Sequence, residues 1–406
     1  MTKININSPK TVIFCNKCVH TNQHITSSPT FSDDKSHINR IRMGFVDGTC
    51  DACIQIERKY NQNIDWKQRE ANLHKILEKY RSRNGSYDCI VPGSGGKDSV
   101  FQAEILKKKY KMNPLTVTFS PSLYTDIGMK NFHNWPIFGD VHNFLYTPRG
   151  GVHRQLTKLA FKNLLHPFQP FISGQRHFAS HMAMQFGIPL IFYGESQSEA
   201  GAPGEKDEIM MPYKFWSNDS AKKILISGIE KEELKKKYNI TENDLKFYLP
   251  LEISTLKKND IRQLYLGEFE KFEPQENYYL ATKVSRFEAS PERTQQTFSK
   301  YSSIDDKIDN FHFYTAYIKF GYGRTTEEAS KEIRHKYITR DEGIKLVHKY
   351  DNEFPKRYFY DFLNYLDISE DEFYETVDEF RPEHIWEKKG NDYKFCNNWV
   401  LKNKIK

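Results

Sequence analysis

The 406 residues of this chain are enough for two or three domains with a large core, and 38% of them are apolar. The 60 Lys and Arg residues outnumber the 53 Asp and Glu residues by only 7, an excess too small to argue for nucleic acid. No apolar run is long enough to span a membrane, and the N-terminal ten residues lack the apolar segment of a signal peptide. The composition therefore predicts a cytoplasmic globular protein without a membrane span, for which nucleic acid is not the expected partner.

Residues 1–60 are predicted to form a metal-binding segment. Four of the six cysteines make two Cys-x2-Cys pairs, which are Cys15 with Cys18 and Cys50 with Cys53. In a reducing compartment such pairs hold a metal more often than they form disulfides. Four thiolates suit a structural Zn2+, which would stabilise a segment too small to fold by burial alone, and an iron–sulfur cluster is the alternative. We expect His20, His24 and His37, between the pairs, to be exposed loop residues.

A nucleotide-binding domain is predicted for residues 61–255. Residues 65–80 have the apolar spacing of an amphipathic linking helix. Residues 89–91 and 115–119 are typical of buried strands, and the spacing between them turns helical from Lys97. A glycine pair thus lies at a strand-to-helix turn, where free backbone amides and the helix dipole can hold an anion.

The turn itself, residues 94–99, has the sequence Ser-Gly-Gly-Lys-Asp-Ser and differs from the Walker pattern. It resembles the pyrophosphate-loop (PP-loop) signature of enzymes that split ATP between the α and β phosphates. The resemblance implies that four residues cradle the phosphates, namely Ser94, Gly95, Gly96 and Ser99. Lys97 would neutralise phosphate charge, and Asp98 would lie near Mg2+. An ordinary polar turn is the alternative.

The loop that follows the second strand, residues 120–128, would lie at the carboxyl edge of a parallel sheet, where ligands bind. We predict that Thr118, Ser120 and Tyr124 surround the adenine and ribose, with a plain connecting loop as the alternative.

Helices and strands continue to alternate up to residue 195. The patterns predict a helix over 152–165, a strand over 168–173, a helix over 175–186 and a strand over 188–193. Such alternation predicts a doubly wound parallel sheet. Glu195 follows the last strand and is a candidate for metal or substrate contact, although a structural role is equally open. Residues 201–243 are polar, and we interpret them as an inserted loop and a solvated helix.

The last part of the chain, residues 256–406, is predicted to be a mainly helical domain. Thr325 and Thr339 each precede a Glu by three residues, which is the capping-box pattern at a helix start. The cluster formed by Asp305, Asp306 and Lys307 could bind phosphate with a metal, or could form surface ion pairs of little energetic weight.

The chemistry of such a loop is transfer of AMP to an oxygen, followed by displacement of AMP by a nucleophile; the loop alone leaves the acceptor open. Outside the two pairs only Cys89, in a predicted core strand, and Cys396 remain, which disfavours sulfur transfer. The chain also carries no recognisable glutaminase nucleophile, so nitrogen transfer would need ammonia from a separate subunit.

From about residue 12 to 355 the sequence resembles the N-acetyl sugar amidotransferases of the WbpG and PseA type. The match rests on the cysteine pairs, the glycine loop and further motifs at residues 123–128, 165–171, 193–195, 305–309 and 320–326. The longer region 201–243 and the tail after residue 354 depart from the family.

The resemblance implies conversion of an acetamido group on a bacterial surface sugar to an acetamidino group, in lipopolysaccharide O-antigen or flagellin (nonulosonic, such as pseudaminic, acid) glycan pathways. The amide oxygen would be adenylylated by ATP and then displaced by ammonia. The ammonia would come from a HisH-like glutaminase with a HisF-like cyclase partner. The Asp305 to Lys307 cluster and an exposed turn ending at Arg324 would then be catalytic. A tRNA-thiolating enzyme and a non-catalytic ATP-binding subunit are the alternatives.

Overall fold

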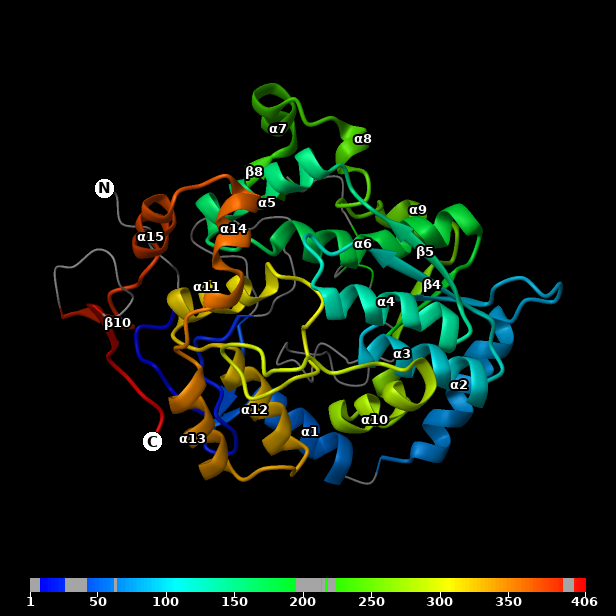
Figure 1. The fold of residues 1–406 in the computed structure, drawn as a ribbon. Helices are drawn as coiled ribbons and strands as arrows, with labels where there is room; N and C mark the ends of the chain where they lie inside the picture. Colours follow the sequence, from blue (N-terminus) through cyan, green and yellow to red (C-terminus); the bar gives the residue numbers. More distant parts are fainter. Residues whose placement is uncertain are drawn as a thin grey trace.

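The computed structural model describes residues 8–25, 42–61, 64–194, 213, 216–217, 224–389 and 398–406. A five-stranded sheet with helices on both faces forms its centre (Figure 1). The strands are β3 (Cys89–Pro92), β4 (Pro114–Phe119), β5 (His142–Tyr146), β6 (Leu190–Tyr193) and β9 (Arg262–Tyr265). The order is β5-β4-β3-β6-β9 and every pairing is parallel. The predicted α/β class and parallel sheet are thereby confirmed. From β3 the chain adds β4 and β5 on one side and then β6 and β9 on the other, and parallel sheets bind ligands where the direction of strand addition reverses in this way.

Two layers of helices cover the sheet. One face packs against α5 (Gly150–Leu164) and α6 (Gln169–Phe186), and the other against α3 (Lys97–Glu104) and α10 (Pro274–Ser285), with α4 (Asp126–Phe138) beside them (Figure 1). The pleat sends alternate side chains to opposite faces. Ile90 and Ile191 therefore join the core on the α6 side, while Val91 and Phe192 join the core on the α3 side.

The remaining elements complete the chain. The other helices are α1 (Asp51–Asn61), α2 (Trp66–Tyr80), α7 (Lys231–Tyr238), α8 (Glu242–Leu245), α9 (Ile253–Lys258), α11 (Asp309–Phe320), α12 (Arg324–Arg334), α13 (Arg340–Tyr350), α14 (Phe359–Leu366) and α15 (Glu370–Glu379). Short strand pairs are β1 (Phe45–Val46) with β2 (Thr49–Cys50), β7 (Leu225–Ile226) with β8 (Ile229–Glu230), and β10 (Trp386–Lys388) with β11 (Trp399–Leu401). The last third is mainly helical, as predicted.

The strand predicted over residues 168–173 is wrong, because this segment forms the first turn of α6. Pro170 stands at the helix start, where its fixed φ angle and missing N–H are favourable. Phe171 and Phe178 then bury the same side of the helix against Phe119. β9, which lies beyond residue 255, is a strand that the sequence pattern did not indicate.

The two predicted capping boxes have different outcomes. Thr339 caps α13 with Glu342, as expected. Thr325 instead lies inside α12, which begins one residue earlier, and its hydroxyl donates to the Gln296 carbonyl at 2.6 Å. The buried carboxylate of Asp351 caps α12, since it accepts from the backbone N–H of Gly323 at 2.8 Å and from that of Thr326 at 3.0 Å. Because this capping residue lies 25 residues from Thr326, no local sequence pattern predicts it.

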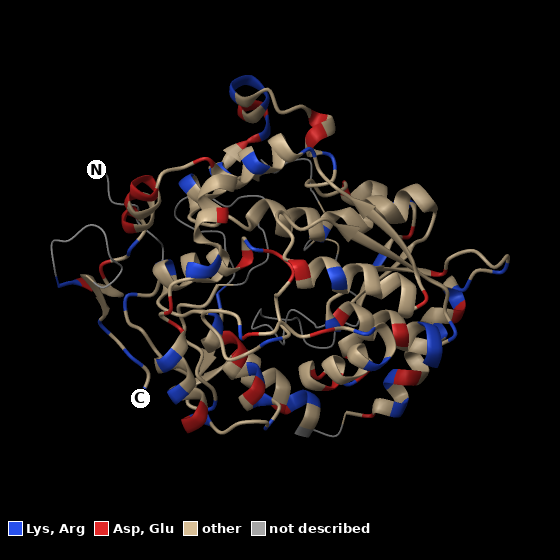
Figure 2. Cartoon of the chain, viewed as in Figure 1, with Lys and Arg blue, Asp and Glu red and all other residues tan. Residues whose placement is uncertain are grey.

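Basic and acidic residues alternate along the outer helices in the cartoon of Figure 2. Lys235, Lys236 and Lys237 are exposed on α7, and Lys237 pairs with Glu233 at 2.6 Å, in keeping with a solvated helix. In the described part of the chain, no helix combines the length and the apolar character needed to cross a bilayer.

Candidate active site

A cavity of about 660 Å³ opens at the carboxyl ends of β3, β4 and β6. The glycine loop after β3 forms one wall, and α11 and α12 form the opposite wall. This is the edge at which parallel sheets of this kind bind ligands.

The glycine loop is fitted tightly against α4. Gly95 has a φ of 81°, and a Cβ added to it would lie 2.8 Å from the Asn131 carbonyl oxygen and 2.9 Å from Phe132 Cα. Glycine is therefore required here both by the backbone conformation and by space. The next residue, Gly96, is the N-cap of α3 and supplies no side-chain cap, so the first amides of the helix face the cavity uncapped by a side chain.

Lys97 and Asp98, the first residues of α3, both line the cavity. The Lys97 Nζ lies 2.6 Å from Asp98 Oδ2, and Asn277 Nδ2 donates to Asp98 Oδ1 at 2.9 Å. Burial opposes ionisation of Asp98, but Lys97 and Asn277 together hold its pKa below the ordinary value. The loop therefore presents a buried ammonium group beside an ionised carboxylate.

Ser94 and Ser99 complete the loop at the cavity wall. Ser99 Oγ donates to the Gly96 carbonyl at 2.9 Å and so closes the turn. Ser94 lies close enough to Asp305 to favour the ionised form of that carboxyl, although burial has the larger effect and raises the pKa of Asp305.

The structure does not bring the three predicted adenosine residues to the lining of the cavity. Thr118 Oγ1 donates to the Gly93 carbonyl at 2.7 Å, so it braces the strand that carries the glycine loop. Ser120 Oγ donates to the Pro121 carbonyl at 3.2 Å. Tyr124 is half-buried in a bridge to Asp306, and burial raises the pKa of its phenol. Their neighbours Val117 and Phe119 line the cavity instead.

The predicted Asp305 to Lys307 cluster divides between the cavity and the protein interior. Asp305 lines the cavity, and burial raises its pKa. Asp306 turns away, where it accepts backbone N–H bonds from Ser122 at 2.5 Å and Ile308 at 2.8 Å, and burial raises its pKa to about 8. Lys307 pairs with Asp361 at 2.8 Å. Asp306 and Lys307 thus hold the loop in place from outside the cavity lining.

The turn before α12 is buried, which corrects the expectation that it is exposed. Phe320 and Tyr322 are each 3% exposed and Arg324 is 0% exposed. Arg324 Nε donates to Glu328 Oε1 at 2.8 Å, its Nη2 donates to the Ser302 carbonyl, and its guanidinium lies 5.0 Å from the Phe313 ring centre. Arg324 therefore supports the cavity wall from behind. Glu195 lies outside the described residues, so its predicted role stays a prediction.

A second wall of charged residues was missed by the sequence analysis. Glu327, Glu328, Lys331 and Glu332 of α12 all line the cavity. Gln275 Nε2 donates to Glu332 at 2.9 Å, and burial raises the pKa of Glu332. The i, i+4 spacing of Glu328 and Glu332 places both on one helix face, but the same spacing is common on solvated helices.

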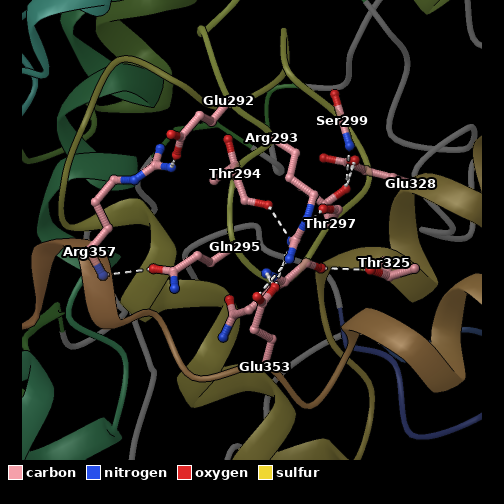
Figure 3. Close-up of polar contacts among 11 residues, drawn as sticks. Glu292, Arg293, Thr294, Gln295, Thr297, Ser299, Thr325, Glu328, Glu353 and Arg357 are labelled. Carbon is pink, nitrogen blue, oxygen red and sulfur yellow. Dashed lines mark hydrogen bonds and ion pairs between the residues drawn. The ribbon is translucent and has the colours of Figure 1, made fainter.

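The segment over residues 292–299, which leads into the cavity-lining residues 299–303, is held by ion pairs and hydrogen bonds (Figure 3). Arg293 forms two bonds of 2.7 Å to Glu353, whose carboxylate also accepts from the Gln296 N–H at 2.9 Å. Thr297 Oγ1 donates to Glu328, which connects this loop to α12. This segment and α12 are therefore fixed relative to each other.

The four predicted metal ligands come together near the cavity. The Sγ atoms of Cys15, Cys18, Cys50 and Cys53 all lie within 4.8 Å of one another and are buried. Cys15 and Cys53 are 3.9 Å apart, and Cys18 and Cys50 are 3.7 Å apart. A tetrahedral Zn2+ with Zn–S bonds of about 2.3 Å requires about 3.8 Å between sulfurs. The donor set thus fits a structural zinc ion, and four thiolates leave it no open position.

His20 and His24 are buried at 3% and 5% exposure, so the expectation of exposed loop histidines is wrong for both; His37 lies outside the described residues. Their ring centres are 4.6 Å apart, and the Tyr322 ring lies 5.1 Å from His24. Both histidines line the cavity. Arg340 donates to the carbonyl oxygens of Cys15 and Cys18, each at 3.2 Å, and so fixes the metal segment to α13.

Comparison with known proteins identifies the part of the chain that forms the α11–α12 wall. Residues 295–403 match the family described as "LPS biosynthesis protein WbpG-like, C-terminal domain". This region belongs to the WbpG-like family. It includes Asp305, Asp309 and the charged face of α12.

A second comparison covers a short stretch. The chain is 35% identical over 105 residues to the uncharacterized protein MJ1599 of Methanocaldococcus jannaschii, which is 25% of this chain and 31% of that protein. The chain thus spans about a third of the length of this relative, and the relative's name assigns it no activity.

Proposed function

We propose that the protein is an ATP-dependent amidotransferase that converts an acetamido group of a bacterial surface sugar to an acetamidino group, in lipopolysaccharide O-antigen or flagellin glycan biosynthesis. The observation that carries this proposal is the glycine loop and the uncapped start of α3 on one wall of a cavity whose other wall belongs to a WbpG-like domain. One wall is suited to phosphates, and the other belongs to a family described by lipopolysaccharide biosynthesis.

In the proposed reaction, the acetamido oxygen attacks the α-phosphorus of ATP and pyrophosphate leaves. Ammonia then adds to the activated carbon, AMP departs with the oxygen, and loss of a proton leaves C=NH. The amides of Gly96 to Ser99 would bind the phosphates, and Lys97 would neutralise the charge that builds up as pyrophosphate departs. Mg2+ would supply further charge neutralisation, and the ionised Asp98 on this wall is suited to hold it.

The walls of the cavity would position the second substrate. Asp305 belongs to the WbpG-like wall and lies beside Ser94 of the glycine loop, so it would hold the sugar amide close to the ATP. Ammonia would be supplied by a separate HisH-like glutaminase with a HisF-like cyclase partner, since the sequence contains no recognisable glutaminase nucleophile.

The test is mass spectrometry of N-acetylated bacterial sugars incubated with the zinc-loaded protein, Mg-ATP and ammonium chloride. The expected products are AMP and a sugar in which NH replaces the amide oxygen. Lys97→Ala should abolish AMP formation, whereas Lys108→Ala, an exposed lysine of the same helical segment, should leave it unchanged. Formation of AMP without a modified sugar would refute the proposed sugar acceptor but would support the AMP-forming reaction. Normal turnover in Lys97→Ala would refute the nucleotide site, and tRNA binding that weakens steeply with salt would favour a tRNA-modifying enzyme.

A further inference from the structure

The α6 side of the cavity carries a cation that forms no ion pair with any residue that the structure describes. Arg176 of α6 lines the cavity and is half-buried. Among the described residues, no carboxylate, carbonyl or hydroxyl accepts a hydrogen bond from its guanidinium; the contact of Arg176 is through its backbone carbonyl, which accepts from Tyr193 Oη at 3.1 Å. Burial lowers the pKa of Arg176, because removal from water disfavours its charged form.

A second polar side chain on the same face has an unused donor. Gln263 of β9 lines the cavity, is 3% exposed, and its Nε2 has no hydrogen-bond partner within the described structure. Gln263 is in register with Ile191, whose side chain packs on the α6 side of the sheet. The pleat therefore turns Gln263 toward α6, together with Tyr265 two residues further along. Leaving a buried amide donor without an acceptor is unfavourable.

Within the described residues, the elements that carry these two donors contribute no carboxylate to the cavity. The carboxylates that line the cavity come from α3 or from residue 305 onward, namely Asp98, Asp305, Asp309, Glu327, Glu328 and Glu332. In the described parts of α6, β6 and β9, no Asp or Glu lines the cavity. Two phenols, those of Tyr193 and Tyr265, complete this side, with ring centres 6.2 Å apart. The donors thus face a space that an anionic group would fit.

We propose that Arg176 and Gln263 bind an anionic group, a phosphate or a carboxylate, of the sugar that shares the cavity with ATP. The guanidinium fork matches two oxygens of either group, and an amide N–H can bond a third acceptor atom. The identification of the ligand as a sugar rests on the proposed function, whereas the anion site rests on the two side chains. Arg176 lies on α6, on the opposite face of the sheet from α3, so this site is separate from the glycine loop.

The test measures binding, without turnover, by isothermal titration calorimetry of the zinc-loaded full-length protein. The probes are N-acetylglucosamine 1-phosphate, N-acetylneuraminic acid, uncharged N-acetylglucosamine, and Mg-free ATP. The wild-type protein should bind the phosphate or the carboxylate probe more tightly than the uncharged sugar, and the preferred probe identifies which anion the site takes. Arg176→Gln should weaken that probe by about 10- to 100-fold, as expected for a lost charge-assisted hydrogen bond, and should leave ATP affinity unchanged.

Three further variants sharpen the result. Arg176→Lys keeps the positive charge but lacks the two-pronged guanidinium group, so it should bind the charged probe more tightly than Arg176→Gln does. Arg176→Lys can also replace Arg176→Gln in the test if the latter does not fold. Gln263→Leu should weaken the charged probe by a smaller factor. Arg83→Gln, which removes the same charge from an exposed loop, should behave as the wild type.

The proposal is overturned if Arg176→Gln and Arg176→Lys bind the charged probes like the wild type, if the weakening is confined to ATP, or if neither charged probe binds better than the uncharged sugar. None of these outcomes depends on AMP formation, so failure of the anion site and failure of the amidotransferase proposal remain distinguishable.

Discussion

Comparing Gly95→Ala with Gly85→Ala separates two costs of a side chain in the glycine loop, namely the steric clash and the left-handed backbone conformation. Gly95 and Gly85 have nearly the same φ, 81° and 77°, but a Cβ at Gly85 meets nothing within 4 Å, whereas one at Gly95 meets the backbone of α4 at 2.8 to 2.9 Å. Left-handed backbone in a non-glycine residue costs about 1 to 2 kcal/mol. Backbone atoms cannot swing aside as a flexible side chain can, so overpacking adds about 1 to 3 kcal/mol at Gly95.

We therefore expect Gly85→Ala to lower the free energy of unfolding by about 1 to 2 kcal/mol and Gly95→Ala by about 2 to 5 kcal/mol. Urea unfolding followed by circular dichroism measures both. Gly95→Ala should also lose ATP affinity at a temperature where it is folded, because the loop must move away from α4, and Gly85→Ala should keep it. Equal destabilisation of the two variants, or unaltered ATP binding in Gly95→Ala, would refute the steric account of the loop.

Two further predictions concern the supports of the cavity. Burial raises the pKa of Asp351 from 3.8 to about 6, so its contribution to stability is full below about pH 4 and is lost as the pH rises toward 6. Asp351→Asn cannot titrate, and the difference in unfolding free energy between wild type and variant should therefore fall by about 3 kcal/mol between pH 4 and pH 7; a constant difference would contradict this. Cys50→Ser should lose most of the bound zinc measured by mass spectrometry and lower the melting temperature, whereas Cys89→Ser, in a core strand, should keep its zinc; a full zinc content in Cys50→Ser would exclude the four-thiolate site.

The features predicted well from the sequence are those determined by neighbouring residues. The strand before the glycine loop, the helix that starts at Lys97 and the next strand each follow from apolar spacing within about ten residues. The two cysteine pairs each bring two thiolates together locally, so only the meeting of the pairs depends on the fold. Periodicity and metal-ligand spacing are sufficient for such features.

The wrong predictions fall where distant residues decide the outcome. A short apolar run such as residues 168–173 fits a strand or a buried helix turn equally well, and packing against Phe119 selects the helix. Thr325 had the right neighbours for a capping box, but the Asp351 carboxylate occupies the cap. For Lys307 the sequence left a phosphate ligand and an ion pair open, and the ion pair is observed, with Asp361 54 residues away.

The two histidines of the metal segment show why sequence motifs alone could not predict which residues line the cavity. His20 and His24 lie between the cysteine pairs, yet they are buried because Tyr322, about 300 residues later, packs on them and Arg340 holds the adjacent carbonyl groups. Val19 and Ala329 share a small core in the same region, so the metal segment and the WbpG-like region form one continuous wall. The glycine loop is held mainly by α4 and β4, which lie outside this wall. We therefore expect loss of a metal from the four cysteines to disturb the side of the cavity formed by α12 more than the glycine loop, so that binding of the proposed sugar would weaken more than binding of ATP.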